Sequence, residues 1–80
     1  MDPREIEKLI QKGLPDSQVE VRTDGQGHYE ALIVSSVFDG ERSLRRHQLV
    51  YQTLEGLVGT DIHALALKTL TPEELKASGS

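Results

Sequence analysis

The N-terminal segment repeats its apolar residues at helical spacing. Asp2 can cap the free amides of a helix start, and Pro3 suits the first helical position. Gly13 can adopt the left-handed conformation of a helix cap, and a proline follows it two positions later, so it marks the end. The apolar residues that share one face between these signals are Ile6, Leu9 and Ile10. The pattern predicts a first helix over about residues 3–12.

Two alternating segments come next, joined by a glycine-containing turn. In residues 18–23 apolar and polar side chains alternate, which is typical of a half-buried strand. Residues 24–27, with the sequence Asp-Gly-Gln-Gly, have the composition of a turn. Residues 28–35 have an apolar centre and predict a second strand. Because the connection is short, the two strands should form an antiparallel hairpin.

After the second strand the period of the pattern becomes helical. Phe38, Asp39 and Gly40 predict a tight turn or a single helical turn. Residues 43–57 predict the longest helix, which Gly59 would end. The apolar side of this helix is expected to comprise Leu44, His47, Val50, Tyr51, Leu54, Leu57 and Val58. Tyr51 would then lie in the core, with its hydroxyl at the rim.

The C-terminal part predicts a third strand over residues 62–69 and a short helix capped by Thr71. The helical crossover before the third strand excludes a hairpin and favours parallel pairing with the second. The predicted fold class is therefore α+β, with an αββααβ order, a three-stranded mixed sheet covered by helices and a short C-terminal helix. Residues 1–77 should form a single domain and residues 78–80 a disordered tail.

Length and composition limit what this domain can do. Eighty residues allow one thin hydrophobic core. Because the chain has no cysteine, it cannot supply thiolate to a metal or cluster, and such sulfur would have to come from elsewhere. The borderline metal ligands that remain are His28, His47 and His63.

The balance of charge argues mildly against nucleic acid as a partner. Thirteen acidic and 9 basic residues give a formal charge of −4, whereas proteins that bind duplex DNA usually present a basic face. Arg42, Arg45 and Arg46 could contact phosphate, but a solvated helix face is the favoured interpretation. No catalytic set of residues is visible, so we expect no enzyme. The sequence contains neither an apolar run long enough for a membrane span nor a secretion signal, and we expect a cytoplasmic location.

Four segments together resemble the BolA family along nearly the whole chain. They are residues 23–31, residues 38–40, residues 46–51 and residues 62–74. The combination of Arg-His-x-x-Val-Tyr with Ile-His-Ala-Leu-x-Leu-Lys-Thr is fairly specific. The likeness is closest to the branch that has a histidine in its first strand-connecting loop. It implies a type II KH-like fold, which agrees with the element order predicted above.

The resemblance also implies a cofactor and a partner. BolA proteins share a [2Fe–2S] cluster with a monothiol glutaredoxin, whose cysteine and glutathione supply the sulfur ligands. The nitrogen ligands implied for this chain are His63, at the start of the last strand, and His28, in the loop. No cluster is expected on the isolated chain. Some BolA proteins act as transcriptional regulators that bind DNA, which is the alternative function.

The predicted strand pairing gives an independent reason to expect these two histidines together. His28 begins the second strand and His63 the third, so parallel adjacent strands would bring both to one edge of the sheet. His47 falls on the apolar face of the long helix, where it should be partly buried, and it is the alternative ligand. Because His28 follows two glycines, ordering its loop should be less favourable than holding His63 on a packed strand.

Overall fold

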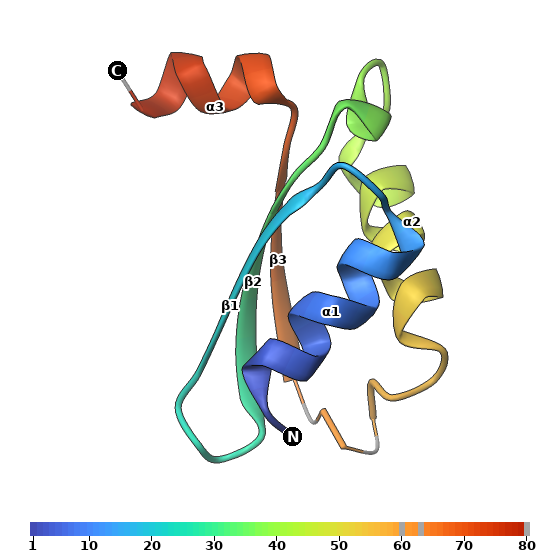
Figure 1. Ribbon diagram of the computed structural model, residues 1–80, viewed down its shortest axis with the longest axis vertical. Helices are drawn as coiled ribbons and strands as arrows, with labels where there is room; N and C mark the ends of the chain where they lie inside the picture. The colour runs from blue at the N-terminus through green and yellow to red at the C-terminus, as the bar shows by residue number, and fades with distance from the viewer. Residues whose placement is uncertain (60, 63, 80) are drawn as a thin grey trace.

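The helices and strands follow the predicted order. A computed structural model describes residues 1–59, 61–62 and 64–79, and Thr60, His63 and Ser80 lie outside the described part. The elements are α1 (Pro3–Gly13), β1 (Gln18–Thr23), β2 (His28–Val34), the 3-10 turn η1 (Ser36–Phe38), α2 (Ser43–Leu54), β3 (Ala64–Leu70) and α3 (Pro72–Gly79) (Figure 1). This order confirms the α+β class.

β2 is the central strand of the sheet, whose order is β1-β2-β3. β1 pairs with it in antiparallel register, with Gln18 opposite Val34. β3 pairs with it in parallel register, with His28 opposite Ala64. The hairpin and the parallel pairing are therefore both confirmed. Parallel neighbours need a long connection, and α2 provides it.

The helices α1 and α2 cover one face of the sheet, while α3 lies on the other side at one end (Figure 1). Alternate side chains of β2 turn toward α1 and α2 and are buried, namely Tyr29, Ala31 and Ile33. The largest fully buried side chains are Phe38, Ile6, Ile10, Ile33, Leu54, Ile62 and Val50. The core thus lies between the sheet and two helices, and most of the second sheet face stays uncovered.

Two contacts fix α1 against its neighbours. A Cβ atom built at Gly13 would lie 2.5 Å from Cγ2 of Thr53, so the close approach of α1 to α2 depends on glycine at this position. On the sheet side, Oε2 of Glu7 accepts a hydrogen bond of 2.9 Å from the backbone N–H of Val21. This bond satisfies a donor on the outer edge of β1, which has no neighbouring strand on that side.

The long helix is shorter than predicted. α2 ends at Leu54, and Glu55 and Gly56 follow with φ of 47° and 83° in the left-handed region. Gly59 therefore does not end the helix. Leu57 and Val58 nevertheless pack against the core from the turn. Their apolar character is what extended the helical pattern past the true end.

The expected apolar side of α2 was also too wide. Leu44 is 73% exposed and Tyr51 is 41% exposed, so neither lies in the core. These residues are seven positions apart and share the outer side of the helix. The buried side is narrower, and its fully buried residues are Val50 and Leu54.

Other element boundaries also differ from the pattern. The turn expected at residues 38–40 is a single 3-10 turn that starts two residues earlier, at Ser36. β3 begins at Ala64 and not at the predicted residue 62. Ile62 is fully buried and forms an isolated bridge with Val58. α3 extends to Gly79, and the disordered tail at residues 78–80 stays a prediction about motion in solution.

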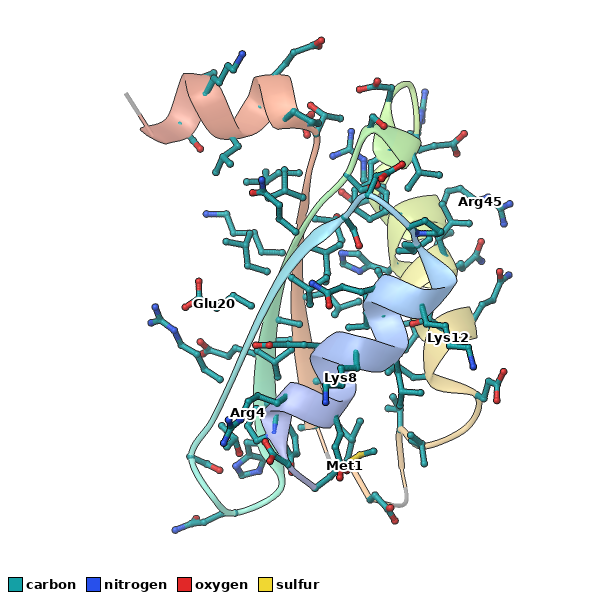
Figure 2. All side chains as sticks on the ribbon, viewed as in Figure 1. Met1, Arg4, Lys8, Lys12, Glu20 and Arg45 are labelled. Carbon is teal, nitrogen blue, oxygen red and sulfur yellow. The ribbon has the colours of Figure 1, made fainter. Side chains whose placement is uncertain are left out.

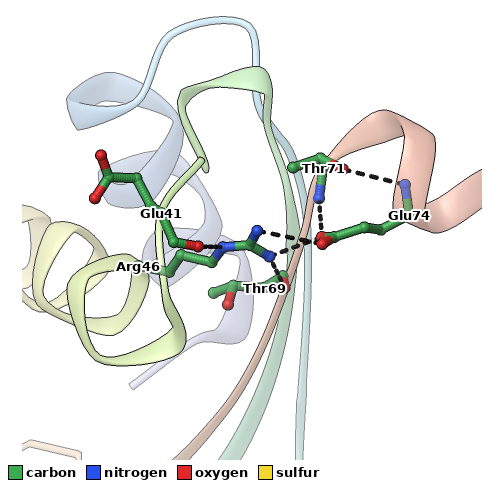
Figure 3. A network of polar contacts seen from close by, with 5 residues as sticks. All are labelled: Glu41, Arg46, Thr69, Thr71 and Glu74. Atoms are coloured by element: carbon green, nitrogen blue, oxygen red, sulfur yellow. Dashed lines mark hydrogen bonds and ion pairs between the residues drawn. The ribbon is translucent and has the colours of Figure 1, made fainter. Parts of the chain in front are cut away.

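Arg46 joins the start of α2 to the end of β3 and to α3 (Figure 3). Its guanidinium donates to the carboxylate of Glu74 through Nη1 at 2.7 Å and Nη2 at 3.2 Å. It also donates to the backbone carbonyls of Thr69 and Glu41, at 3.2 and 2.7 Å. Only 12% of the Arg46 side chain is exposed, and it lies over the ring of Phe38. These contacts hold α3 in place at the end of the sheet.

Glu74 also caps α3. Its Oε1 accepts a hydrogen bond of 2.8 Å from the backbone N–H of Thr71, and the Thr71 hydroxyl accepts one of 3.1 Å from the N–H of Glu74. This reciprocal pair is a capping box, which confirms the predicted cap. The hydrogen bond from Arg46, and then that from Thr71, lowers the pKa of Glu74 to about 2.

This low pKa makes the anchoring of α3 sensitive to acid. The stabilisation from ionised Glu74 is complete above the ordinary value of 4.5 and is lost as the pH falls through about 2. Glu74→Gln should therefore lower the thermal midpoint at neutral pH, and its difference from the wild type should shrink across that window. Circular dichroism during heating at a series of pH values measures this. Glu73→Gln, in the same helical turn, is the control and should keep the wild-type pH dependence; identical profiles for the two variants would contradict the assignment.

Candidate functional site

The loop between β1 and β2 is held by hydrogen bonds within itself. The hydroxyl of Thr23 donates to the carbonyl of His28 at 2.9 Å and accepts from the N–H of Gly25 at 3.1 Å. The N–H of Asp24 donates to the same carbonyl at 3.4 Å. Gly25 and Gly27 have φ of 82° and 87°, a region that other residues rarely adopt. The sequence predicts that ordering this loop is unfavourable. In the structure, hydrogen bonds within the loop hold it as a turn.

His28 stands where this loop meets β2, and Asp24 holds its ring. Nδ1 of His28 lies 2.8 Å from Oδ2 of Asp24, while Oδ1 of Asp24 accepts a hydrogen bond of 2.7 Å from the N–H of Gln26. The bond from Gln26, followed by that from His28, lowers the pKa of Asp24. The His28 and Asp24 side chains remain 62% and 46% exposed. The loop therefore presents an accessible imidazole that a carboxylate holds by one nitrogen.

The strand register brings the start of β3 beside this loop. His28 pairs with Ala64, and the N–H of Ala64 donates to the carbonyl of Gly27 at 3.1 Å. His63 lies outside the described residues, so its expected meeting with His28 stays a prediction. What the structure confirms is the parallel register on which that prediction depends.

His28 borders a hollow on the uncovered face of the sheet. The hollow has a volume of about 540 Å³, and Arg22, Glu30, Ala64 and Ala66 are among its lining residues. Glu20 of β1 points to this side of the sheet, away from α1 and α2 (Figure 2). Because alanine side chains are short, they leave room beside the imidazole for a group larger than water.

His47 is not part of this site. It lies half-buried on α2, in the helical layer, whereas His28 borders a hollow on the opposite face of the sheet. Its role as an alternative ligand stays a prediction, and the structure does not bring it to His28.

The three arginines singled out from the sequence have different environments. The guanidinium of Arg46 is committed to Glu74 and to two backbone carbonyls. Arg42 and Arg45 are exposed, and Arg45 projects away from the sheet (Figure 2). Contact with nucleic acid stays a prediction. Arg42 and Arg45 are accessible for it, whereas the guanidinium of Arg46 already has partners within the chain.

Sequence reasoning missed a row of cations on α1. Arg4, Lys8 and Lys12 are exposed and four positions apart, so they follow one side of the helix (Figure 2). The signal was present as a spacing of four within the first predicted helix. The helical layer also carries the exposed Arg45, and Nε of Arg4 lies 3.9 Å from Oδ1 of Asp2.

Among residues 1–59, 61–62 and 64–79, no group of three or more histidine, cysteine, aspartate or glutamate side chains is placed to hold a metal ion. No helix in the same part of the chain has the length and apolarity to cross a membrane.

Comparison with known proteins settles the family. A family model described as BolA-like protein matches residues 7–74. The chain belongs to the BolA family. The acid stress protein IbaG of Escherichia coli is 33% identical over 75 residues, which are 92% of this chain and 88% of that protein.

A second BolA relative and a solved BolA structure extend the comparison. The DNA-binding transcriptional regulator BolA of Escherichia coli is 43% identical over 54 residues, or 68% of this chain and 51% of the regulator. This chain thus matches about half the length of that relative. A bolA protein homologue from Coxiella burnetii is 40% identical, with a TM-score of 0.83 over 95% of this chain and 97% of the other. The arrangement of helices and strands described above is therefore a BolA fold.

Proposed function

We propose that this BolA protein is a non-enzymatic partner that shares a [2Fe–2S] cluster with a monothiol glutaredoxin, in iron–sulfur trafficking or iron regulation. The observation that carries the proposal is the accessible imidazole of His28, which Asp24 holds through Nδ1 beside a hollow. Family resemblance supplies the identity of cluster and partner. The proposal places the protein in the cytoplasm or in an organelle of bacterial origin.

The donor groups of this chain fit half of such a site. Neutral imidazole is a competent ligand for iron, and its use in place of thiolate raises the potential of a cluster. The chain has no cysteine, so the sulfur ligands would come from the glutaredoxin cysteine and from glutathione. His28 and His63 would supply nitrogen from this side, and Ala64, the neighbour of His63 in sequence, pairs with His28.

The position of His28 suits a ligand shared with another protein. The hollow beside it opens on the sheet face that α1 and α2 do not cover. A partner can therefore reach the imidazole without displacing a helix. The chain's own residues present and orient nitrogen ligands in this proposal, and none of them acts as a catalyst.

Anaerobic reconstitution with a monothiol glutaredoxin and glutathione tests this function. The mixed complex should show a cluster spectrum in visible absorption and circular dichroism, whereas the chain alone should hold no iron or sulfide after desalting. His63→Ala should abolish or strongly change the spectrum, and His28→Ala should weaken or shift it. His28→Cys should be tolerated, because thiolate also binds iron.

His47→Ala is the matched control for these substitutions. It removes the remaining histidine, which lies in the helical layer, and should leave the spectrum unchanged. An unchanged spectrum for His63→Ala and His28→Ala would reject the ligand assignment. Stoichiometric cluster on the chain alone would reject the shared site.

A second candidate function is DNA binding of the BolA type. The specific observation in its favour is the row of exposed cations Arg4, Lys8 and Lys12 on α1, with Arg45 on α2. The regulator BolA of Escherichia coli carries this activity in its name. The formal charge of −4 opposes it, because like charge repels the phosphate backbone.

We expect this second activity to be weak. The dissociation constant for duplex DNA should be roughly 10⁻⁵ M or higher at physiological salt. Fluorescence anisotropy over a salt series measures it, with Lys12→Ala and Arg45→Ala as the test variants and Lys76→Ala, on α3, as the control. Submicromolar, sequence-selective binding that the test variants lose and the control keeps would make DNA binding the main function.

A further inference from the structure

The carboxylate of Asp24 divides its two oxygens between two partners in the same loop. Oδ1 accepts the N–H of Gln26 at 2.7 Å, which fixes the carboxylate within the turn. Oδ2 lies 2.8 Å from Nδ1 of His28. The backbone of this turn is itself closed by bonds from Thr23 and Asp24 to the carbonyl of His28. Asp24 is thus anchored in the loop by hydrogen bonds that do not involve the His28 ring.

This arrangement determines which nitrogen of His28 carries the proton. An ionised carboxylate only accepts hydrogen bonds, so Nδ1 must donate. In the neutral ring the proton then sits on Nδ1, and Nε2 keeps a free lone pair. Imidazole side chains in water favour the opposite form, with the proton on Nε2. Asp24 therefore selects the form that can bind a metal through Nε2.

We propose that Asp24 is a positioning residue for the iron ligand His28: its carboxylate fixes the ring orientation and the Nδ1–H tautomer, so that Nε2 is the nitrogen presented to iron. This inference rests on the proposed function, because it needs His28 to be a ligand. Metal-binding histidines commonly donate their other ring N–H to a carboxylate or carbonyl, and His28 and Asp24 form a pair of this kind.

A purely structural role for the pair is the competing explanation. Both side chains are largely accessible, and exposed ion pairs contribute little to stability. The two explanations differ in what they predict for Asp24→Asn. The asparagine Oδ1 can still accept the N–H of Gln26, so the turn is kept. Its Nδ2 group then faces Nδ1 of His28 and can only donate, which forces the proton onto Nε2.

The first arm of the test reads the tautomer in the isolated protein. Two-bond proton–nitrogen correlation spectra are recorded about two pH units above the ordinary histidine pKa of roughly 6.5. The wild type should show His28 protonated on Nδ1, and Asp24→Asn should show it protonated on Nε2. Asp16→Asn makes the same chemical change on an exposed residue outside the hollow and should leave the wild-type tautomer. A wild-type ring protonated on Nε2 would overturn the inference while leaving the proposed function standing.

The second arm reads cluster retention in the complex with glutaredoxin and glutathione. Asp24→Asn should speed the loss of the cluster absorption to a chelator by about tenfold, the lower end of the effect of removing such a partner. Asp16→Asn should have the wild-type rate. In the His28→Cys background the same Asp24→Asn change should have little effect, because a thiolate has no tautomer.

The outcomes separate the two proposals. Equal losses from Asp24→Asn in the wild-type and His28→Cys backgrounds would show a structural role only and overturn the inference. An unchanged cluster spectrum for His28→Ala would show that His28 is not a ligand. That result would reject both the inference and the His28 part of the proposed function. A tautomer switch together with faster loss only in the histidine background would support Asp24 as the positioning residue.

Discussion

The parallel pairing of β2 with β3 fixes the position of almost everything else in this protein. It extends from the bond between the Ala64 N–H and the Gly27 carbonyl, at 3.1 Å, to that between the Ser35 N–H and the Leu70 carbonyl, at 3.0 Å. Parallel neighbours need a long crossover, so α2 must pass over one face of the sheet. Together with α1 it covers that face and leaves most of the other uncovered. The same pairing puts the starts of both strands at one end, which is where the loop with His28 lies.

The two ends of the sheet use similar chemistry for different purposes. At the end of β3, the carboxylate of Glu74 meets the guanidinium of Arg46, whose side chain is only 12% exposed. Both oxygens of the Glu74 carboxylate bond to the guanidinium, and this contact holds α3 in place. At the start of β2, the carboxylate of Asp24 meets an imidazole that is 62% exposed. There the contact occupies one ring nitrogen and leaves the other available, which is the arrangement that a ligand needs.

Local patterns predicted the elements well where short-range chemistry decides them. The alternation in residues 18–23 gave the true bounds of β1, and Thr71 capped α3 as expected. The predicted end of α2 was wrong because Leu57 and Val58 lie in the turn after the helix. They are apolar because they pack against the core from that turn. Leu44 and Tyr51 are exposed because only a narrow side of α2 contacts the core. The helical period of the sequence does not determine the width of that side.

The candidate site was predicted in part. Resemblance and strand order indicated His28, but no pattern in the sequence indicated that Asp24 would hold its ring, because this depends on the turn that Gly25 and Gly27 permit. The clamp between Arg46 and Glu74 joins residues 28 positions apart and likewise depends on the tertiary fold. The sequence alone therefore groups Arg46 with the exposed Arg42 and Arg45, although only 12% of its side chain is exposed.

The proposed function requires that this chain gives nitrogen, and its partner sulfur, to one cluster. The most direct measurement is pulsed electron paramagnetic resonance of the reduced complex with glutaredoxin and glutathione, in which only the histidines of this chain carry nitrogen-15. We expect a strong coupling between the cluster and labelled nitrogen, with the His28 contribution lost in His28→Ala and the His47→Ala spectrum unchanged. A cluster present in the complex without any such coupling would contradict it.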